Sequence, residues 1–443
     1  MILIKLMKTR VFNIYFLVFF IIFPSKGKQK NYLKNETNNE EKNIVYKDYI
    51  FQDNIKTLLC HQIDQEASLP IINIETNDKL HISFDDLDGE VKDYYYTIIH
   101  CNSDWTESKL IKSEYISGFF DNPITDFQLS FNTNQEYTHY YFNFPNNNIK
   151  PLLSGNYVFK IYREDRSIIA YKRFMILENK VKISANVNRG TLAKNRNEKH
   201  ELDFSIEHPK INISDPFTEI KVIIKQNNNE ETKITDLTPI YIKNNLLIYD
   251  YDNENNFVAN NEFRYFEFSN LKYFSERVEK IIIGNKEELN QVYLFKDKKR
   301  SFDQYSIYPD NNGRFIINKQ ESWNSSIEAD YAIVHFILPM EEVSYGDIYI
   351  IGAFSDWQLK DKFKLQFNYS KKQYERNVYL KQGFYNYCYA LKDTIKNEID
   401  LSYIEGTHYQ TRNDYYIYVY YRGMEDRSDR LIGFLKTSSK ELF

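Results

Sequence analysis

The chain has few of the residues from which many enzymes build an active site. Only 13 of its 443 residues are glycine, and the sequence contains neither a phosphate-cradling glycine loop nor a Gly-x-Ser-x-Gly motif. Its eight histidines form no His-Glu-x-x-His motif and no close pair with the spacing of a zinc site. These absences predict a protein that is not an enzyme and that holds neither a metal nor a cofactor.

Cysteine is scarce as well. Cys60, Cys101 and Cys388 are odd in number and widely spread, so at most one disulfide can form within the molecule. Cys60 and Cys101 could pair in an oxidising compartment, but burial as small apolar residues is the favoured interpretation. The adjacent pairs Cys60-His61 and His100-Cys101 could converge on one ion, although hydrogen-bonded, half-buried side chains are the simpler account. Disulfides are therefore not the main source of stability.

The chain has no excess of positive charge. Lys and Arg number 57 against 62 Asp and Glu, which gives a net charge of -5 and no general attraction to nucleic acid or anionic lipid. Two acidic runs, residues 85–90 and 250–254, lack the ligand spacing and the terminal Glu of a calcium loop. We interpret both runs as solvated turns, and we expect no nucleic-acid partner.

Long apolar runs are also missing, except near the N-terminus. Residues 11–23 are largely apolar but too short for a usual membrane span, and three basic residues precede them. Small residues follow at Ser25 and Gly27. The pattern predicts a cleaved export signal over residues 1–27, an uncleaved anchor being the alternative, and no membrane span after cleavage. Polar residues 28–45 are predicted to form a disordered leader.

Aromatic residues, in contrast, are abundant. Tyr (38) and Phe (32) favour pleated, half-buried surfaces, and the sequence shows no long helical periodicity. Asn312-Gly313 predicts a tight hairpin between residues 305–308 and 314–317, because both residues tolerate positive φ. Strands are expected at residues 94–100, 137–144, 157–162, 219–225, 246–251 and 263–268. The predicted fold class is all-β, with tandem immunoglobulin-like β-sandwich domains.

The length suits several domains. We expect a β-sandwich domain over residues 46–180, a second β domain over 181–325, and an early-set immunoglobulin-like β-sandwich domain over 326–443. Five strands are expected in the last domain, at residues 331–338, 347–354, 373–380, 383–391 and 414–422.

Two short segments are candidates for contact with a partner. In the first, Asn102, Asp104 and Trp105 form a polar loop around an aromatic ring; in the second, Phe119 and Phe120 follow a glycine. The alternatives are structural: Asn102 and Asp104 could cap and turn the backbone around Trp105, and Phe119 and Phe120 could be core residues.

Several phrases along the chain resemble the plug protein of the type IX secretion system. They are HCNSDW (100–105), SFNTNQEYTHYYFNFPN (130–146), SGNY (154–157), RFMI (173–176), NEFRYFE (261–267), DNNGRF (310–315), GAFSDW (352–357), LKQGFYNY (380–387) and DRLIGF (429–434). The resemblance implies an exported periplasmic protein of Bacteroidetes-type bacteria that binds an outer-membrane translocon barrel and sterically closes it. It supplies no catalytic residues.

GAFSDW and the following LKQGFYNYCY are also similar to the early-set immunoglobulin-like modules attached to glycogen-acting enzymes. This second likeness supports a sandwich fold more than sugar binding, because fold and function separate easily. It makes a carbohydrate-binding β-sandwich protein the alternative function, with a β-sandwich hydrolase third. Trp105, Trp323 and Trp357 could stack on sugar rings, although packing is the more common use of large aromatics in β-domains.

Overall fold

The computed structural model describes residues 44–285, 288–308 and 310–439. The predicted export signal and nearly all of the predicted leader lie outside these residues. Residues 43–443 form one unit, built from mainly antiparallel sheets and a few single-turn helices, so the all-β prediction is confirmed. In the described part of the chain, no helix is both long and apolar enough to cross a membrane.

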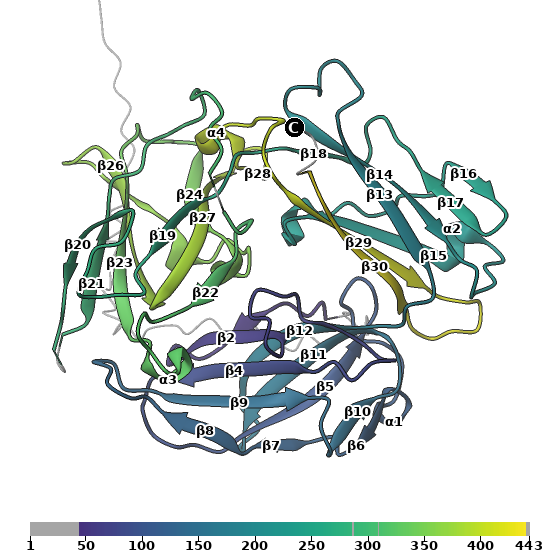
Figure 1. The fold of residues 1–443 in the computed structure, drawn as a ribbon, viewed down its shortest axis with the longest axis horizontal. Coiled ribbons are helices and arrows are strands. Elements are labelled where there is room, and N and C mark those ends of the chain that lie inside the picture. Colours follow the sequence, from purple (N-terminus) through teal and green to yellow (C-terminus); the bar gives the residue numbers. More distant parts are fainter. Residues whose placement is uncertain (1–43, 286–287, 309, 440–443) are drawn as a thin grey trace, which may run out of the picture. The chain divides into compact units, whose positions relative to one another are not determined.

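The first two-sheet body, here called the N-lobe, comprises residues 44–178 (Figure 1). Its elements are β1 (Tyr49–Ile50), β2 (Ile55–Gln62), β3 (Ile71–Asn73), β4 (Leu80–Asp86), β5 (Tyr94–Cys101), α1 (Lys112–Tyr115), β6 (Ile116–Gly118), β7 (Asn122–Ile124), β8 (Asp126–Leu129), β9 (Thr138–Phe144), β10 (Ile149–Pro151), β11 (Gly155–Arg163) and β12 (Ile168–Leu177). The two main sheets run β1-β12-β11-β5-β7, with β3 beside β12, and β2-β4-β9-β8, and β10 pairs with β6 in a small third sheet. Tyr140, Phe142 and Phe144 alternate along β9 and point into the core, as period-2 patterning requires.

The second body, the M-lobe, combines residues 181–258 with residues 414–439. Its elements are β13 (Lys182–Arg189), β14 (Lys199–Glu207), α2 (Pro216–Glu219), β15 (Ile220–Gln226), β16 (Tyr241–Lys243), β17 (Leu246–Tyr249), β18 (Asn256–Val258), β29 (Asp414–Tyr421) and β30 (Arg430–Ser438). The sheets are β13-β14-β17-β16, with β18 beside β14, and β15-β29-β30. The strand expected at 414–422 is therefore present, but it pairs with β15 and not with the other four strands expected after residue 326.

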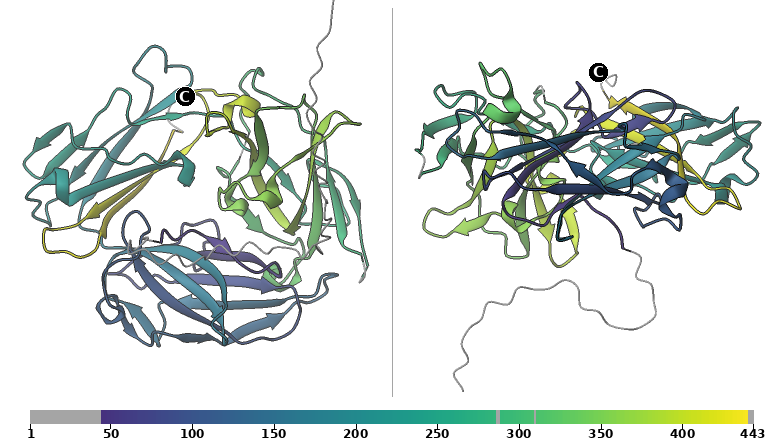
Figure 2. Two further views of the ribbon diagram at one scale, coloured as in Figure 1. Left: turned by 180° about the vertical axis from the view of Figure 1, so that it is seen from behind. Right: turned by 90° about the horizontal axis from the view of Figure 1, so that it is seen from below.

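The third body, the C-lobe, comprises residues 263–405. Its elements are β19 (Arg264–Glu267), β20 (Val278–Ile282), β21 (Asn290–Leu294), β22 (Phe315–Ile317), α3 (Ser325–Glu328), β23 (Tyr331–Leu338), β24 (Gly346–Ile351), β25 (Gln366–Asn368), β26 (Gln373–Lys381), β27 (Gly383–Asp393), β28 (Glu398–Asp400) and α4 (Ser402–Glu405). β27 pairs with β19, β22, β24 and β28, and the facing sheet runs β20-β21-β23-β26-β25. Figure 2 shows the three lobes from behind and from below.

The predicted Asn312-Gly313 turn is present, but the hairpin around it is not. Both residues have positive φ, 52° and 81°, as a tight turn requires. Residues 305–308 are not a strand, and β22 pairs with β27 instead. A Cβ atom on Gly313 would lie 2.2 Å from Cη2 of Trp357, so this turn is shaped by the close approach of the indole ring. The domain boundaries proposed from the sequence, and the immunoglobulin-like character of the sandwiches, stay predictions.

Candidate functional site

The HCNSDW phrase forms a tight loop directly after β5. The amide of Trp105 donates to the carbonyl of Asn102 at 2.9 Å, and Trp105 has φ of +67°. The carboxylate of Asp104 accepts from the amide of Thr106 at 2.9 Å and from its hydroxyl at 2.6 Å. Asp104 therefore turns the backbone, as the structural alternative for this residue states.

The same loop fastens the N-lobe to the M-lobe. Ser103 donates to Oδ2 of Asp429 twice, from its amide at 2.9 Å and from its hydroxyl at 2.6 Å. The Nε atom of Arg422 lies 2.8 Å from Oδ1 of the same carboxylate, which is 1% exposed. Burial raises the pKa of Asp429, but the hydrogen bonds from Ser103 and the nearby cations outweigh it, so the net shift is downward. The carboxylate of Asp429 therefore stays charged, and its contacts with Ser103 connect the two lobes.

The SGNY phrase lies at the same contact between the N-lobe and the M-lobe, here called a joint. A Cβ atom on Gly155 would lie 2.7 Å from Nε2 of His100 and 3.0 Å from the carbonyl oxygen of Asp429, so a larger residue would displace its neighbours. Asn156 donates to the carbonyl of Asn102 at 3.0 Å and accepts from the hydroxyl of Tyr420 at 2.9 Å. HCNSDW, SGNY and DRLIGF, which are far apart in the sequence, therefore meet at one buried contact.

Trp105 is part of this joint. Its ring is 5% exposed and lies 4.2 Å from the guanidinium carbon of Arg173, the first residue of the RFMI phrase. Arg173 also donates from Nε to the carbonyl of Tyr46 at 2.8 Å and lies 3.4 Å from Glu230 of the M-lobe. The packing interpretation of Trp105 is confirmed.

Phe119 and Phe120 lie outside the core, so the alternative that they are core residues is wrong. They follow β6 and are 67% and 41% exposed, and the ammonium of Lys112 lies 5.8 Å from the ring of Phe120. A partner can reach these two rings directly, whereas Trp105 is enclosed. The partner-binding role of Asn102, Asp104, Trp105, Phe119 and Phe120 stays a prediction.

A second joint, which the sequence did not reveal, connects the N-lobe to the C-lobe. Asp85 is fully buried at the end of β4, so its interpretation as part of a solvated turn is wrong. Oδ2 of Asp85 accepts from Nζ of Lys381 and from the hydroxyl of Tyr331, both at 2.6 Å. Oδ1 lies 2.7 Å from Nδ1 of His139. Burial raises the pKa of Asp85, but Lys381 and His139 more than offset this, so the net pKa is lowered and the carboxylate stays charged.

Neighbouring residues in the SFNTNQEYTHYYFNFPN phrase reinforce this joint. The backbone amides of Asn134 and Gln135 donate to the carboxylate of Asp330, at 2.7 Å and 3.1 Å. The hydroxyl of Tyr137 donates to the carbonyl of Ala329 at 2.8 Å, and its ring lies 4.2 Å from Nζ of Lys381. The other acidic run, residues 250–254, does form a largely exposed turn, as expected.

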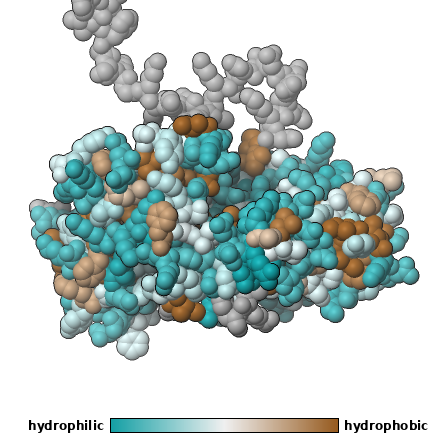
Figure 3. Space-filling model, turned by 90° about the horizontal axis from the view of Figure 1, so that it is seen from above, coloured by the Kyte–Doolittle hydropathy of each residue, from teal (hydrophilic) through white to brown (hydrophobic). Residues whose placement is uncertain are grey.

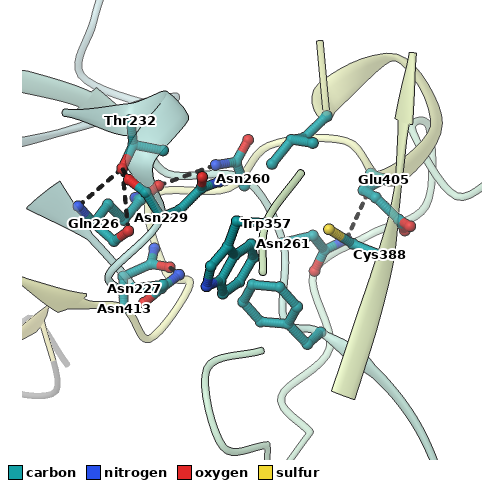
Figure 4. A pocket seen from close by; sticks show the side chains of 12 residues that line it. Gln226, Asn227, Asn229, Thr232, Asn260, Asn261, Trp357, Cys388, Glu405 and Asn413 are labelled. Atoms are coloured by element: carbon teal, nitrogen blue, oxygen red, sulfur yellow. Dashed lines mark hydrogen bonds between the residues drawn. The ribbon is translucent and has the colours of Figure 1, made fainter. Parts of the chain in front are cut away.

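Trp357, the last residue of the GAFSDW phrase, lines a small pocket rich in amide side chains (Figure 4). Amides beside a tryptophan are typical of sugar sites, but the cavity measures about 10 Å³, room for one water molecule. Trp357 is 7% exposed and packs edge-on against Phe263, with ring centroids 5.7 Å apart. The pocket does not fit a sugar ring.

The described ranges contain no group of three or more His, Cys, Asp or Glu that could hold a metal ion. Cys60, Cys101 and Cys388 are free and buried, so the interpretation as small apolar residues is confirmed.

Exposed hydrophobic side chains occur on the M-lobe and the C-lobe too. Figure 3 shows hydrophobic side chains gathered at its right-hand end, on the side where Figure 1 labels β16 and β17. In β16 and directly before it, Ile240, Tyr241 and Ile242 are 41%, 59% and 48% exposed, and Trp323 of the C-lobe is fully exposed. Surfaces of this kind are suited to protein contact.

Comparisons with known proteins agree with the phrases found in the sequence. Residues 55–178 match the model of the type 9 secretion system plug protein 1st domain. The crystal structure of a hypothetical protein from Parabacteroides merdae ATCC 43184 superposes with a TM-score of 0.86 at 35% identity, covering 89% of this chain and 100% of that chain. Among curated proteins, none matches the chain.

Proposed function

Because the chain belongs to the family of type IX secretion system plug proteins, we propose that it is a periplasmic stopper that binds the outer-membrane translocon barrel of that system and closes it. The observation that carries this proposal is the match of residues 55–178, which include the N-lobe side of both joints. The role needs a surface and a shape, and it needs no catalytic group.

The mechanism that we propose is steric. A protein that closes a barrel must keep its shape in contact with the barrel wall, so its lobes must not move apart. In this chain the N-lobe is tied to each of the other lobes by a buried, charged network, one around Asp429 and one around Asp85. Such networks have their full strength only in one geometry, which supports a stiff body.

Closure must also be reversible. A stopper that never left the barrel would stop secretion, so its affinity for the empty barrel has to be moderate. A substrate or a second protein that binds the barrel in competition with the stopper lowers its occupancy by mass action. We therefore expect less of this protein on barrels loaded with substrate than on empty ones.

Copurification tests the proposal. An affinity-tagged full-length chain expressed in its native host should bring down a large outer-membrane barrel, and a chain lacking residues 1–27 should not, because it is not exported. A double variant, Phe119→Ser with Phe120→Ser, removes two exposed rings and should recover less barrel, whereas Ile395→Ser with Met424→Ser, at exposed positions on the other two lobes, serves as the control. Recovery of no barrel by the exported wild-type chain would refute the proposal.

A further inference from the structure

A large cavity lies between the three lobes. Its volume is about 1270 Å³, and its lining comes from β2 and β12 of the N-lobe, from β15 of the M-lobe, and from β22 and β26 of the C-lobe. Figure 1 shows β2 and β22 on sides of their lobes that face each other. Lys and Arg outnumber Asp and Glu in this lining, although the whole chain has more acidic than basic residues. The cavity is therefore more positive than the molecule.

Many of the lining cations are neutralised by neighbouring carboxylates. Lys172 lies 2.8 Å from Asp48, and Lys360 lies 2.6 Å from Asp356. Lys225 forms an ion pair with Glu230. These pairs belong to the structure of the walls.

A second set of cations has no such neutralisation. Lys56 of β2 donates to the backbone carbonyl of Asp53, and Arg376 of β26 donates to the backbone carbonyl of Lys362. Among the described residues, no carboxylate lies within 4.0 Å of the charged groups of Lys56, Lys362 or Arg376. Loss of hydration, together with the positive charges of Lys360 and Lys56, lowers the pKa of Lys362 to about 8. The negative charges of Asp356 and Asp53 raise this pKa, but by less. Cations kept together against their repulsion are typical of anion sites.

Two unpaired strand edges face the same cavity. β2 is the edge of the sheet β2-β4-β9-β8, and β22 is the edge of β19-β27-β22; both contribute lining residues. An edge strand presents N–H and C=O groups that can pair with an added extended segment. Apolar side chains such as Leu58 and Phe354 also line the space, which suits a peptide better than a bare inorganic anion.

We propose that this cavity binds an extended peptide segment rich in Asp and Glu, which pairs with the edge of β2 and places carboxylates against Lys56, Lys362 and Arg376. The cations supply charge recognition, and the strand edge supplies main-chain hydrogen bonds that tolerate many sequences. This inference goes beyond the stopper role and does not depend on it.

Fluorescence anisotropy with a labelled ten-residue peptide of alternating Glu and Val tests the inference on the full-length chain after signal removal. The cavity variant is Lys362→Gln with Arg376→Gln, and the control variant is Lys210→Gln with Lys243→Gln, which removes the same charge from exposed positions outside the cavity. We expect binding that is weakened at least about tenfold in the cavity variant and unchanged in the control. Circular dichroism melting establishes that both variants are folded.

Three outcomes would overturn the inference. The first is no binding of the acidic peptide to the wild-type chain. The second is an equal loss of affinity in the cavity and control variants, which would show unspecific attraction. The third is a short polyphosphate of the same charge binding as tightly as the peptide, which would show that the strand edge does not contribute.

Discussion

Lys381→Met is the substitution that tests the joint between the N-lobe and the C-lobe. The Met side chain keeps most of the apolar stem beside Tyr137 but removes the cation 2.6 Å from Asp85. Both side chains of the ion pair are 1% exposed, so water cannot replace the lost partner. Removing one member of such a buried pair costs about 3–5 kcal/mol of the free energy of unfolding.

A double variant separates the charge from the packing. Asp85→Asn with Lys381→Met removes both charges, while the amide oxygen of Asn still accepts from Tyr331. We expect the double variant to lose only about 1–2 kcal/mol, less than the single variant, because no buried charge is left unpaired. Lys243→Met, at an exposed position, is the matched control and should stay within about 0.5 kcal/mol of the wild type.

The pH dependence gives a further check on the same variant. Burial raises the pKa of Asp85, and Lys381 is the strongest of the groups that lower it, so its removal raises this pKa and the folded variant binds a proton at a higher pH than the wild type does. The destabilisation of Lys381→Met should therefore shrink as the pH falls from 7 toward 5. Urea denaturation followed by circular dichroism measures both effects. A loss below about 1 kcal/mol at pH 7, or a double variant as unstable as the single one, would refute the reasoning.

Three further predictions concern other parts of the molecule. Burial lowers the pKa of His100 and of His200 to about 4, so NMR titration should find both imidazoles neutral at pH 5.5, and stability that they contribute above pH 6.5 should be lost as the pH falls toward 4; a titration midpoint near 6.5 would contradict their burial. Gly313→Ala should lower the free energy of unfolding by about 1–3 kcal/mol, and with it the thermal midpoint, because Gly313 has a positive φ and an added Cβ would contact Trp357. Gly89→Ala should cost less, because Gly89 has a similar φ but an added Cβ would lie 3.5 Å from its nearest neighbour. Asp429→Ala should cost about 2–4 kcal/mol and speed proteolysis between the N-lobe and the M-lobe; cleavage at the wild-type rate would show that this joint carries no rigidity.

The sequence was sufficient for those strands whose alternating pattern is local. Alternating aromatic residues at 140, 142 and 144 mark one buried face, and β9 has that face in the structure. The positive φ values at Asn312 and Gly313 likewise follow from local residue preference. Features set by neighbours along the chain could be predicted.

Features set by distant partners could not. The run at residues 85–90 contains several carboxylates, a composition typical of solvent-exposed turns, and the buried state of Asp85 depends on Lys381, 296 residues away. β29 has the same aromatic pattern as the strands before it, so its pairing with β15 of the M-lobe is invisible in its own residues. The HCNSDW loop was recognised as unusual, but its use as a joint required Asp429 to be placed beside Ser103.

The most direct test of the stopper role is the ionic conductance of the purified translocon barrel in a planar lipid bilayer. Adding the purified chain to the periplasmic side should close the empty barrel in a saturable manner, and washing it out should restore the current. The Lys381→Met variant, with a loosened joint, should close it less completely at the same occupancy. A barrel that is already closed without the chain, or that stays open with the chain bound, would contradict the account.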